Sequence, residues 1–357
     1  MLTEAQVREA LATVIYPGLR RDIVALGLVG SIAVRNDRVH VSLTLSTERE
    51  EVPGLLRAAI TARLSQVGAV RTEIQLLTPQ RKPVERDPWA RQGRLSGARR
   101  IVAVGAGKGG VGKSTVAVNL ALALRDDGLA VGVLDADIYG PSVPVLLGLE
   151  DGAFRARMTP QKQIIPLEAH GLSVVSFGFF LGAGSPAVWR GPMVGKAVTQ
   201  FSRGVVWQDL DVLVVDLPPG TGDVPLSLAQ SVVVDGAIVV TTPQRLAALE
   251  AAKAVEMFRT LDVPVLGVVE NMSYATCECG RRSFPFGRGG GAEMERTLTV
   301  PLLGQLPFDD RIVADGDRGA PLMVEMPQSE AAAAMRALAA RVRAALRLDE
   351  DAASEVA

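Results

Sequence analysis

Short apolar runs alternate with amphipathic segments from about residue 100 to residue 346. Near-continuous apolar runs of this length are typical of parallel strands that are buried on both faces. The runs cover residues 101–105, 130–134, 172–177, 212–216, 237–241, 265–269 and 302–306, and helical patterns cover 114–126 and 329–346. The alternation predicts an α/β domain at residues 101–346, with a doubly wound, mostly parallel sheet.

The first 80 residues have a different pattern, which predicts a small α+β domain. Helical spacing at residues 4–15 and 52–67 is interleaved with strand candidates at 27–33, 38–45 and 71–77. Residues 81–100 are polar and charged and contain two prolines, which indicates a linker. We expect residues 347–357 to form a flexible tail.

Composition narrows the range of functions. The chain has 357 residues, of which 48% are hydrophobic, enough for two buried cores. Its net charge of −1 gives no global attraction to nucleic acid or to anionic membranes, although a local basic patch is compatible with it. No apolar run reaches the roughly 18 residues of a membrane span, and the first residues lack the features of a signal peptide. We therefore expect a cytoplasmic protein with neither nucleic acid nor membrane as a partner.

A glycine-rich loop between the first apolar run and the helix at 114–126 is the strongest chemical signal. The sequence GKGGVGKST satisfies the P-loop pattern, in which backbone N–H groups and a helix N-terminus hold phosphates. Lys113 is expected to bridge the β- and γ-phosphates of ATP, Ser114 to ligate Mg²⁺, and Thr115 to lie near the α-phosphate. The predicted nucleotide-binding loop consists of Gly107, Lys108, Gly109, Gly110, Val111, Gly112, Lys113, Ser114 and Thr115.

Three aspartates follow apolar runs, at the edge where α/β sheets bind ligands. Asp135 and Asp137 lie in DADIYGPS, and Asp216 opens DLPPGTGD. We assign Asp137 to orienting the attacking water and Asp135 to the Mg²⁺ site, and these two roles could be exchanged. Asp216 is expected to hold Mg²⁺ through water, with Asp223 acting beside it and with the proline turn between them responding to the γ-phosphate. The alternative is that such acids only cap helices.

A second lysine in the loop, Lys108, is not needed by an ordinary P-loop. The KGGVGKS form resembles the deviant Walker A ATPases, which include division-site and partition ATPases. That resemblance implies that Lys108 reaches the nucleotide of a partner subunit across a dimer and acts in catalysis with Lys113 and Asp137. The alternative is a solvated lysine in the loop.

Four motifs together resemble the Mrp/ApbC family of iron–sulfur cluster carriers: DADIYGPS, WRGPM at residues 189–193, DLPPGTGD and ENMSY at residues 270–274. The first 80 residues also look like the small domain that precedes the ATPase in many members and occurs in iron–sulfur assembly proteins. The resemblance implies a homodimer that binds ATP and passes a 4Fe–4S cluster to apo-proteins, with an assembly scaffold as a further partner. It also implies that Asn271 contacts adenine and that the loop of Pro307 closes over the base.

Cys277 and Cys279 are the two cysteines of the chain. Thiols one residue apart are a poor disulfide and a plausible metal site. The family has a C-x-x-C pair after ENMSY, and two such pairs hold one bridging cluster, whereas this chain has C-x-C. We expect the pair to ligate a 4Fe–4S cluster; a 2Fe–2S centre, zinc and no metal remain open. The two histidines, His40 and His170, are expected to be structural.

The function predicted from the sequence is a slow, Mg²⁺-dependent ATPase that carries an iron–sulfur cluster at a dimer interface. The first alternative is a positioning ATPase that acts on membrane or DNA, for which the sequence offers an arginine-bearing C-terminal helix. These arginines are Arg336, Arg341, Arg343 and Arg347. A second alternative is a scaffold in which the nucleotide only sets the shape of the dimer.

Overall fold

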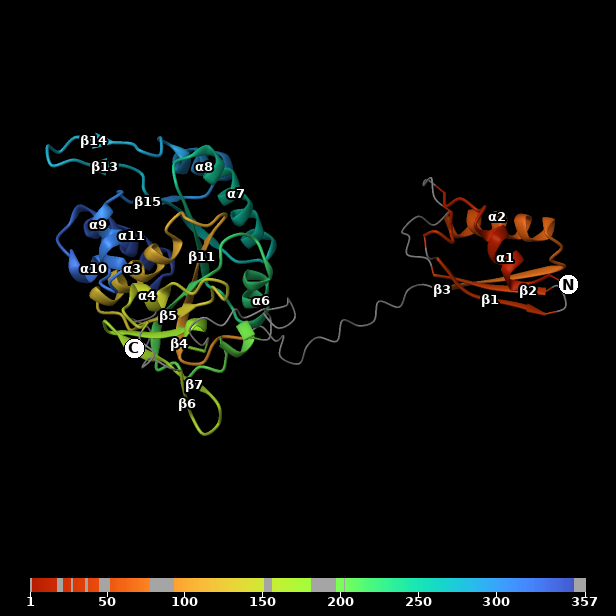
Figure 1. Cartoon of the computed structure of the whole chain (residues 1–357), viewed down its shortest axis with the longest axis horizontal. Coiled ribbons are helices and arrows are strands. Elements are labelled where there is room, and N and C mark those ends of the chain that lie inside the picture. Colours follow the sequence, from red (N-terminus) through yellow and green to blue (C-terminus); the bar gives the residue numbers. More distant parts are fainter. Residues whose placement is uncertain are drawn as a thin grey trace. The chain divides into compact units, whose positions relative to one another are not determined.

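The computed structural model describes residues 2–17, 22–26, 28–35, 38–44, 52–77, 93–150, 156–180, 197–201 and 203–349. The chain forms two compact units, Met1–Pro88 and Trp89–Ala357 (Figure 1). Each unit has its own hydrophobic core.

The smaller unit is a three-stranded sheet covered by two helices. β1 (Val29–Arg35) pairs antiparallel with β2 (Arg38–Thr44), which pairs in parallel with β3 (Arg71–Leu77). A parallel pair needs a crossover, and α2 (Val52–Gln66) supplies it. The first helix, α1 (Glu4–Leu11), is shorter than the predicted 4–15. The core comprises Val7, Leu11, Val41, Leu43, Leu56, Ile60 and Leu64 with their neighbours.

The larger unit is built on an eight-stranded sheet in the order β15-β12-β11-β4-β10-β5-β9-β8. All neighbouring strands are parallel except β8 and β9 at one edge. The strands are β4 (Ala98–Ala106), β5 (Val131–Asp135), β8 (Leu167–Ala169), β9 (Leu172–Ser176), β10 (Leu210–Asp216), β11 (Gly236–Thr241), β12 (Val265–Glu270) and β15 (Leu302–Gln305). The α/β fold class is confirmed, and the antiparallel edge strand β8 is an addition that the apolar runs did not indicate.

Helices cover both faces of this sheet (Figure 1). One face carries α3 (Lys113–Asp126), α10 (Leu322–Glu325) and α11 (Glu330–Ala345), and α4 (Val143–Leu146) packs on α3. The other face carries α7 (Arg245–Thr260) and α8 (Gly290–Leu298). The remaining elements are α6 (Asp223–Ser231), α9 (Asp310–Gly316), the 3-10 helix η1 (Phe177–Phe180) and two short hairpins, β6 (Arg157–Met158) with β7 (Ile164–Ile165) and β13 (Ala275–Thr276) with β14 (Arg282–Ser283).

Both ends of the predicted ATPase region differ in detail from the sequence prediction. β4 begins at Ala98, inside the predicted linker, where Arg100 pairs in register with Val212 of β10. The predicted tail begins with ordered packing, because Leu348 is buried and Asp349 pairs with Arg343 at 2.6 Å. Residues 81–92, the WRGPM segment and residues 350–357 lie outside the described part of the chain.

Candidate functional site

The glycine-rich loop joins the end of β4 to the start of α3. Gly112 is the N-cap of α3 in a left-handed conformation, with φ of 79°. A Cβ on Gly107 would lie 2.1 Å from the backbone of Glu250 in α7, so only glycine fits there. A Cβ on Gly109 or Gly110 would meet nothing within 4 Å. The loop is therefore held against α7 on one side and open on the side where a phosphate chain would lie.

Lys113 and Asp216 form a buried ion pair under this loop. Lys113 Nζ lies 2.5 Å from Asp216 Oδ1 and donates to Ser114 Oγ at 3.0 Å. Asp216 is 0% exposed, and its other oxygen, Oδ2, is buried without a hydrogen-bond partner. Burial raises the pKa of Asp216, and the charge of Lys113 opposes that rise. An unsatisfied carboxylate oxygen beside a serine hydroxyl is a donor set that suits Mg²⁺, which prefers oxygen ligands.

Asp135 lies next to Asp216, because the two residues are in register on β5 and β10. Asp135 is 0% exposed and accepts from Ser176 Oγ at 2.8 Å and from the backbone N–H groups of Asp137 and Val143. Burial, and secondly the negative charge of Asp216, raise the pKa of Asp135 to about 8. The sequence prediction therefore places Asp135 correctly at the strand end, but the structure gives it partners on both oxygens.

The raised pKa of Asp135 predicts a pH effect on stability. Between about pH 4 and pH 8 the folded protein keeps a proton on this carboxyl group that the unfolded chain has lost, so the free energy of unfolding falls as pH rises. Asparagine cannot titrate, so Asp135→Asn should gain stability over the wild type with rising pH, by at most about 1.4 kcal/mol per pH unit.

Urea denaturation of the nucleotide-free and Mg²⁺-free protein across this pH window measures the effect. Asp317→Asn, at the exposed C-cap of α9, is the matched control and should follow the wild-type pH profile. Parallel profiles for wild type and Asp135→Asn would contradict the expected role of Asp135.

Asp137 lies at a cleft of about 510 Å³ between the DADIYGPS and DLPPGTGD segments. Its side chain is 8% exposed, and its Oδ1 accepts from the backbone N–H of Gly140 at 3.2 Å. Tyr139 and the Pro218–Pro219 turn line the same cleft, and Asp223 begins α6 there. Of the three predicted acids, Asp137 is therefore the one that lines an open cleft, which is the position a water-orienting group needs.

Asn271 and Pro307 line one pocket, together with Thr115. Asn271 follows β12, and its Nδ2 donates to the Val111 backbone carbonyl at 2.9 Å, so it contacts the glycine-rich loop directly. Phe308 and Met272 supply apolar walls. The pocket thus combines an amide with apolar surfaces beside the phosphate loop, which is a composition suited to a planar base.

Cys277 and Cys279 lie in the exposed turn of the β13–β14 hairpin, which we call the cysteine hairpin (residues 274–288; Figure 1). Here the sequence prediction was wrong in one respect, because the structure joins the two sulfurs in a disulfide. The reason is local: Gly280, with φ of 76°, closes a tight turn, and its N–H donates to the Cys277 carbonyl at 2.8 Å. The Cα atoms are consequently 5.3 Å apart, within the range that a disulfide requires.

Lys108 and the two histidines form no hydrogen bond or ion pair with the aspartates, the base pocket residues or the cysteines described above. Lys108 is half-buried in the loop, and no hydrogen bond or ion pair links it to the described residues. His170 lies in a turn with φ of 49°, and His40 lies in β2. Within the described ranges no group of three or more His, Cys, Asp or Glu side chains could hold a metal ion. Among the described residues, the cysteine pair is therefore not supplemented by a nearby third ligand.

Sequence reasoning missed two carboxylates near the site. Glu270, at the end of β12, is 0% exposed and accepts from Ser273 Oγ, from Gln305 Nε2 and from the Gly291 N–H. Glu330, in the first turn of α11, binds the base of the cysteine hairpin. The ENMSY motif pointed to Glu270, but nothing in the sequence placed Glu330 next to a segment 48 positions earlier.

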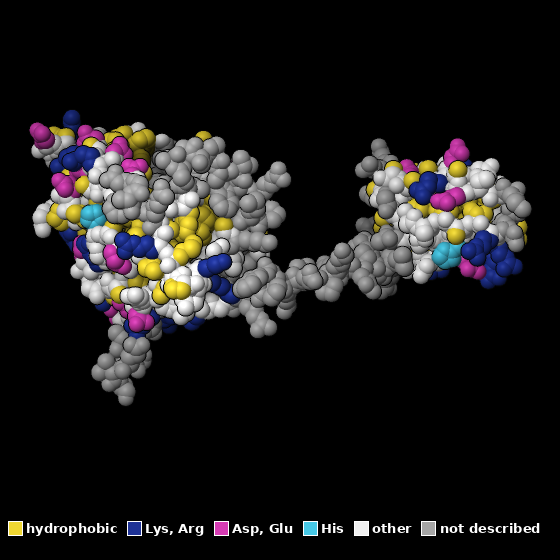
Figure 2. Space-filling model, turned by 60° about the horizontal axis from the view of Figure 1, so that its bottom comes forward, with side chains coloured by type: hydrophobic (Ala, Val, Ile, Leu, Met, Phe, Trp, Pro, Cys, Tyr) yellow, Lys and Arg dark blue, Asp and Glu magenta, His cyan; other side chains and the backbone are white. Residues whose placement is uncertain are grey.

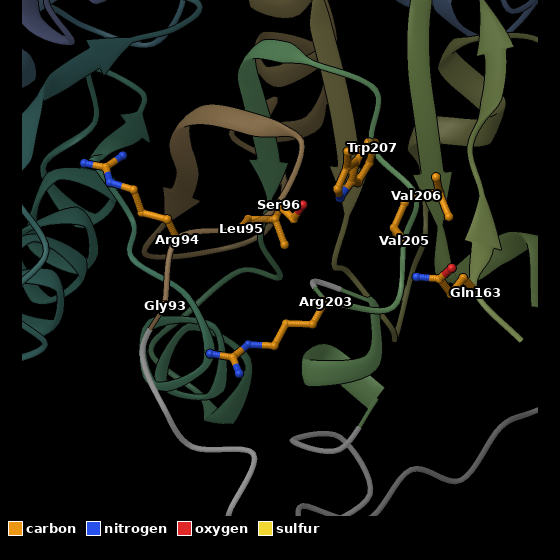
Figure 3. A pocket seen from close by; sticks show the side chains of 9 residues that line it. All are labelled: Gly93, Arg94, Leu95, Ser96, Gln163, Arg203, Val205, Val206 and Trp207. Carbon is orange, nitrogen blue, oxygen red and sulfur yellow. The ribbon is translucent and has the colours of Figure 1, made fainter. Parts of the chain in front are cut away.

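A second cavity, of about 450 Å³, lies near the amino ends of β4 and β10, away from the glycine-rich loop (Figure 3). Arg94, Arg203 and Trp207 are among its lining residues. Arg94 donates to the Arg99 carbonyl and Arg203 to the Ser231 carbonyl. Because these guanidinium groups are bound to backbone oxygens, the described lining of the cavity offers no reacting group comparable with the aspartates near the loop.

The arginines of α11 itself are engaged in contacts, whereas Arg347 lies exposed just after the helix. Arg336 and Arg341 donate to backbone carbonyls, and Arg343 pairs with Asp349. On the face of the larger unit in Figure 2, cationic and anionic side chains are scattered among one another. In the described part of the chain no helix is both long and apolar enough to span a bilayer.

Two family profiles match the chain. The profile described as NUBPL iron-transfer P-loop NTPase matches residues 97–343, and the one described as iron–sulfur cluster assembly protein matches residues 4–76. An iron–sulfur cluster carrier protein of Deinococcus radiodurans is 45% identical over 332 residues, which are 92% of each chain. A protein of the same description from Salmonella typhimurium is 41% identical over 346 residues, 96% of this chain and 92% of the relative.

Solved structures agree with the fold. The nucleotide-binding protein of Archaeoglobus fulgidus, solved in complex with ADP, is 37% identical, with a TM-score of 0.58 over 66% of this chain and 92% of its own. The cell division ATPase MinD of Pyrococcus furiosus is 23% identical, with a TM-score of 0.52 over 68% of this chain and 98% of its own, and shares the fold alone. The resemblance to iron–sulfur cluster carriers is confirmed, and the chain belongs to the family of NUBPL iron-transfer P-loop NTPases.

Proposed function

We propose that the protein is an ATP-hydrolysing carrier that binds an iron–sulfur cluster through Cys277 and Cys279 and passes it to apo-proteins in the cytoplasm. The observation that carries the proposal is that the residue contacting the glycine-rich loop and the cysteine pair are only a few positions apart in the chain. Asn271 contacts the glycine-rich loop, and Cys277 follows it by six positions in an exposed hairpin. A nucleotide site and an accessible thiol pair thus share one segment, and a reducing compartment keeps such thiols free of the disulfide.

The loop residues have distinct roles in this proposal. Lys113 stabilises negative charge on the β- and γ-phosphates, and Asp137 orients the attacking water. Ser114 and the unsatisfied oxygen of Asp216 hold Mg²⁺, with Asp135 beside them. The metal ion, when bound, neutralises phosphate charge. We expect slow turnover.

Two copies of the chain are part of the proposal. A cluster held by four thiolates needs two cysteine pairs, and each chain has one. Leu246 and Leu249 of α7 are 64% and 53% exposed beside the loop that Glu250 supports. Lys108, without a partner among the described residues of its own chain, reaches the nucleotide of the second copy. Exposed leucines next to a nucleotide site support a dimer that forms across that face.

The double change Leu246→Glu/Leu249→Glu is therefore expected to weaken ATP-dependent dimerisation at least about tenfold, since it places charge in an apolar contact. Sedimentation in the presence of a non-hydrolysable ATP analogue measures the dissociation constant. Leu55→Glu is the matched control, because Leu55 in α2 is also 53% exposed but belongs to the smaller unit. If the α7 variant and the control had equal dissociation constants, α7 would not be part of the dimer interface.

The function itself is tested by anaerobic reconstitution with iron and sulfide, followed by transfer to an apo-enzyme whose activity needs a cluster. The wild type should acquire a broad visible absorption and activate the recipient. A protein that stays colourless and activates no recipient would overturn the proposal. The spectrum and the amounts of iron and sulfide per dimer, about four of each or about two of each, also decide between a 4Fe–4S centre, which we propose, and a 2Fe–2S centre.

A further inference from the structure

The base of the cysteine hairpin is fastened to α11 by three side chains, Tyr274, Arg282 and Glu330, which we call the stem clamp. Arg282 Nη2 donates to Glu330 Oε1 at 2.7 Å, and Tyr274 Oη donates to the same oxygen at 3.1 Å. The Arg282 guanidinium also lies over the Tyr274 ring, 4.0 Å from its centroid. The clamp thus ties the chain on both sides of the cysteines to one carboxylate.

The carboxylate of the clamp lies in the capped first turn of α11. Ser329 caps α11, with its Oγ accepting from the Ala332 N–H at 3.1 Å, and Glu330 is in the first turn, where the helix dipole favours an anion. Burial acts to raise the pKa of Glu330, but hydrogen bonds from Thr276, Tyr274 and Arg282 outweigh it, and the pKa is lowered. Glu330 is therefore charged at neutral pH and receives charge-assisted hydrogen bonds from both arms of the hairpin, at a site where the Arg282 and Glu330 side chains are 53% and 41% exposed.

Phe308 connects the hairpin with the pocket of Asn271 and Pro307. Phe308 lines that pocket, and its backbone N–H donates to the Tyr274 carbonyl at 2.6 Å. The ring of Phe286, on the returning arm of the hairpin, meets the Phe308 ring edge-on, with centroids 6.0 Å apart. Both arms of the hairpin therefore contact a residue that lines the proposed base pocket.

We infer that Tyr274, Arg282 and Glu330 are positioning residues for the thiol pair, and that Phe308 transmits nucleotide occupancy to them within one chain. A base that enters the pocket displaces Phe308, and because both hairpin arms rest on Phe308, the turn with Cys277 and Cys279 changes its exposure. This inference rests on the proposed function for the location of the base. It adds a route by which the nucleotide governs when the thiols accept or release their cargo.

The test follows the reaction of the reduced thiols with a chromogenic disulfide reagent, with no nucleotide, with Mg-ADP and with a non-hydrolysable ATP analogue. In the wild type, saturating nucleotide should change the rate at least about threefold. In Glu330→Ala the rates with and without nucleotide should become equal, while ADP should still bind, because Glu330 does not line the base pocket. Since coupling is reciprocal, the affinity for ADP should differ from that of the wild type by no more than the rate ratio that is lost. Glu330→Gln keeps an acceptor for Tyr274 and should restore part of the nucleotide effect.

Glu325→Ala is the matched control: Glu325 is an exposed glutamate in α10 that lies outside the clamp, and the variant should behave as the wild type. The ratio of rates is the decisive readout, because a general loosening of the protein would change the absolute rates and leave the ratio. A ratio of one in the wild type, or an unchanged ratio in Glu330→Ala, would overturn the inference. The assay uses no cluster, so failure to load a cluster would count against the proposed function and not against this coupling.

Discussion

Replacing Lys113 by alanine is expected to reduce ATP hydrolysis by about 100- to 1000-fold, because the variant loses the cation that meets the transferred phosphate. The structure adds a second expected effect, on stability. Lys113 is the cation that contacts the fully buried Asp216, at 2.5 Å. Removing one partner of a buried ion pair leaves an uncompensated charge, and the expected cost is about 3–5 kcal/mol.

Hydrolysis and folding can be separated with a second change. Lys113→Ala/Asp216→Asn removes both charges and should recover most of the lost stability, but none of the hydrolysis. The destabilisation of the single variant should also shrink as pH falls, because burial already raises the pKa of Asp216 and protonation removes the buried charge. Urea denaturation and phosphate release measure the two effects. Lys253→Ala, which breaks an exposed pair with Glu250, is the control and should change stability by less than about 1 kcal/mol. A Lys113→Ala variant with full hydrolysis would exclude the assigned role.

Replacing both Cys277 and Cys279 by serine is expected to lower bound iron and sulfide at least about tenfold after anaerobic reconstitution, because soft thiolates are replaced by hydroxyl groups. ATP hydrolysis by the same variant without a cluster should stay near the wild-type rate, because the cysteines lie in an exposed turn outside the glycine-rich loop. Metal analysis, acid-labile sulfide and the visible spectrum provide the measurement.

Glu278→Gln is the matched control for this variant, because it changes the residue between the cysteines and keeps both thiols. It should load iron and sulfide as the wild type does. Iron retained at the wild-type level in the double serine variant would mean that the cluster is bound elsewhere in the protein.

The alternative of a positioning ATPase gains little support from the structure. Its sequence argument rested on four arginines, Arg336, Arg341, Arg343 and Arg347. The first two donate to backbone carbonyls, and Arg343 pairs with Asp349. The apolar side of α11 packs against the core of the larger unit, where Leu338 and Val342 are buried. A membrane-binding or DNA-binding helix would need one of these faces free.

The sequence by itself determined the α/β architecture of the larger unit, the glycine-rich loop and the acids at the strand ends. Those features follow from local patterns: apolar runs that suit buried strands, and glycines whose positions define a phosphate loop. Only the tertiary structure decided which groups meet. The pairing of Lys113 with Asp216 joins residues 103 positions apart, and the contact of Arg282 with Glu330 joins residues 48 positions apart. The closure of Cys277 onto Cys279 depends on a turn at Gly280 that spacing alone did not reveal. Contacts of this kind arise from the packing of distant elements, and the order of residues along the chain carries no direct record of them.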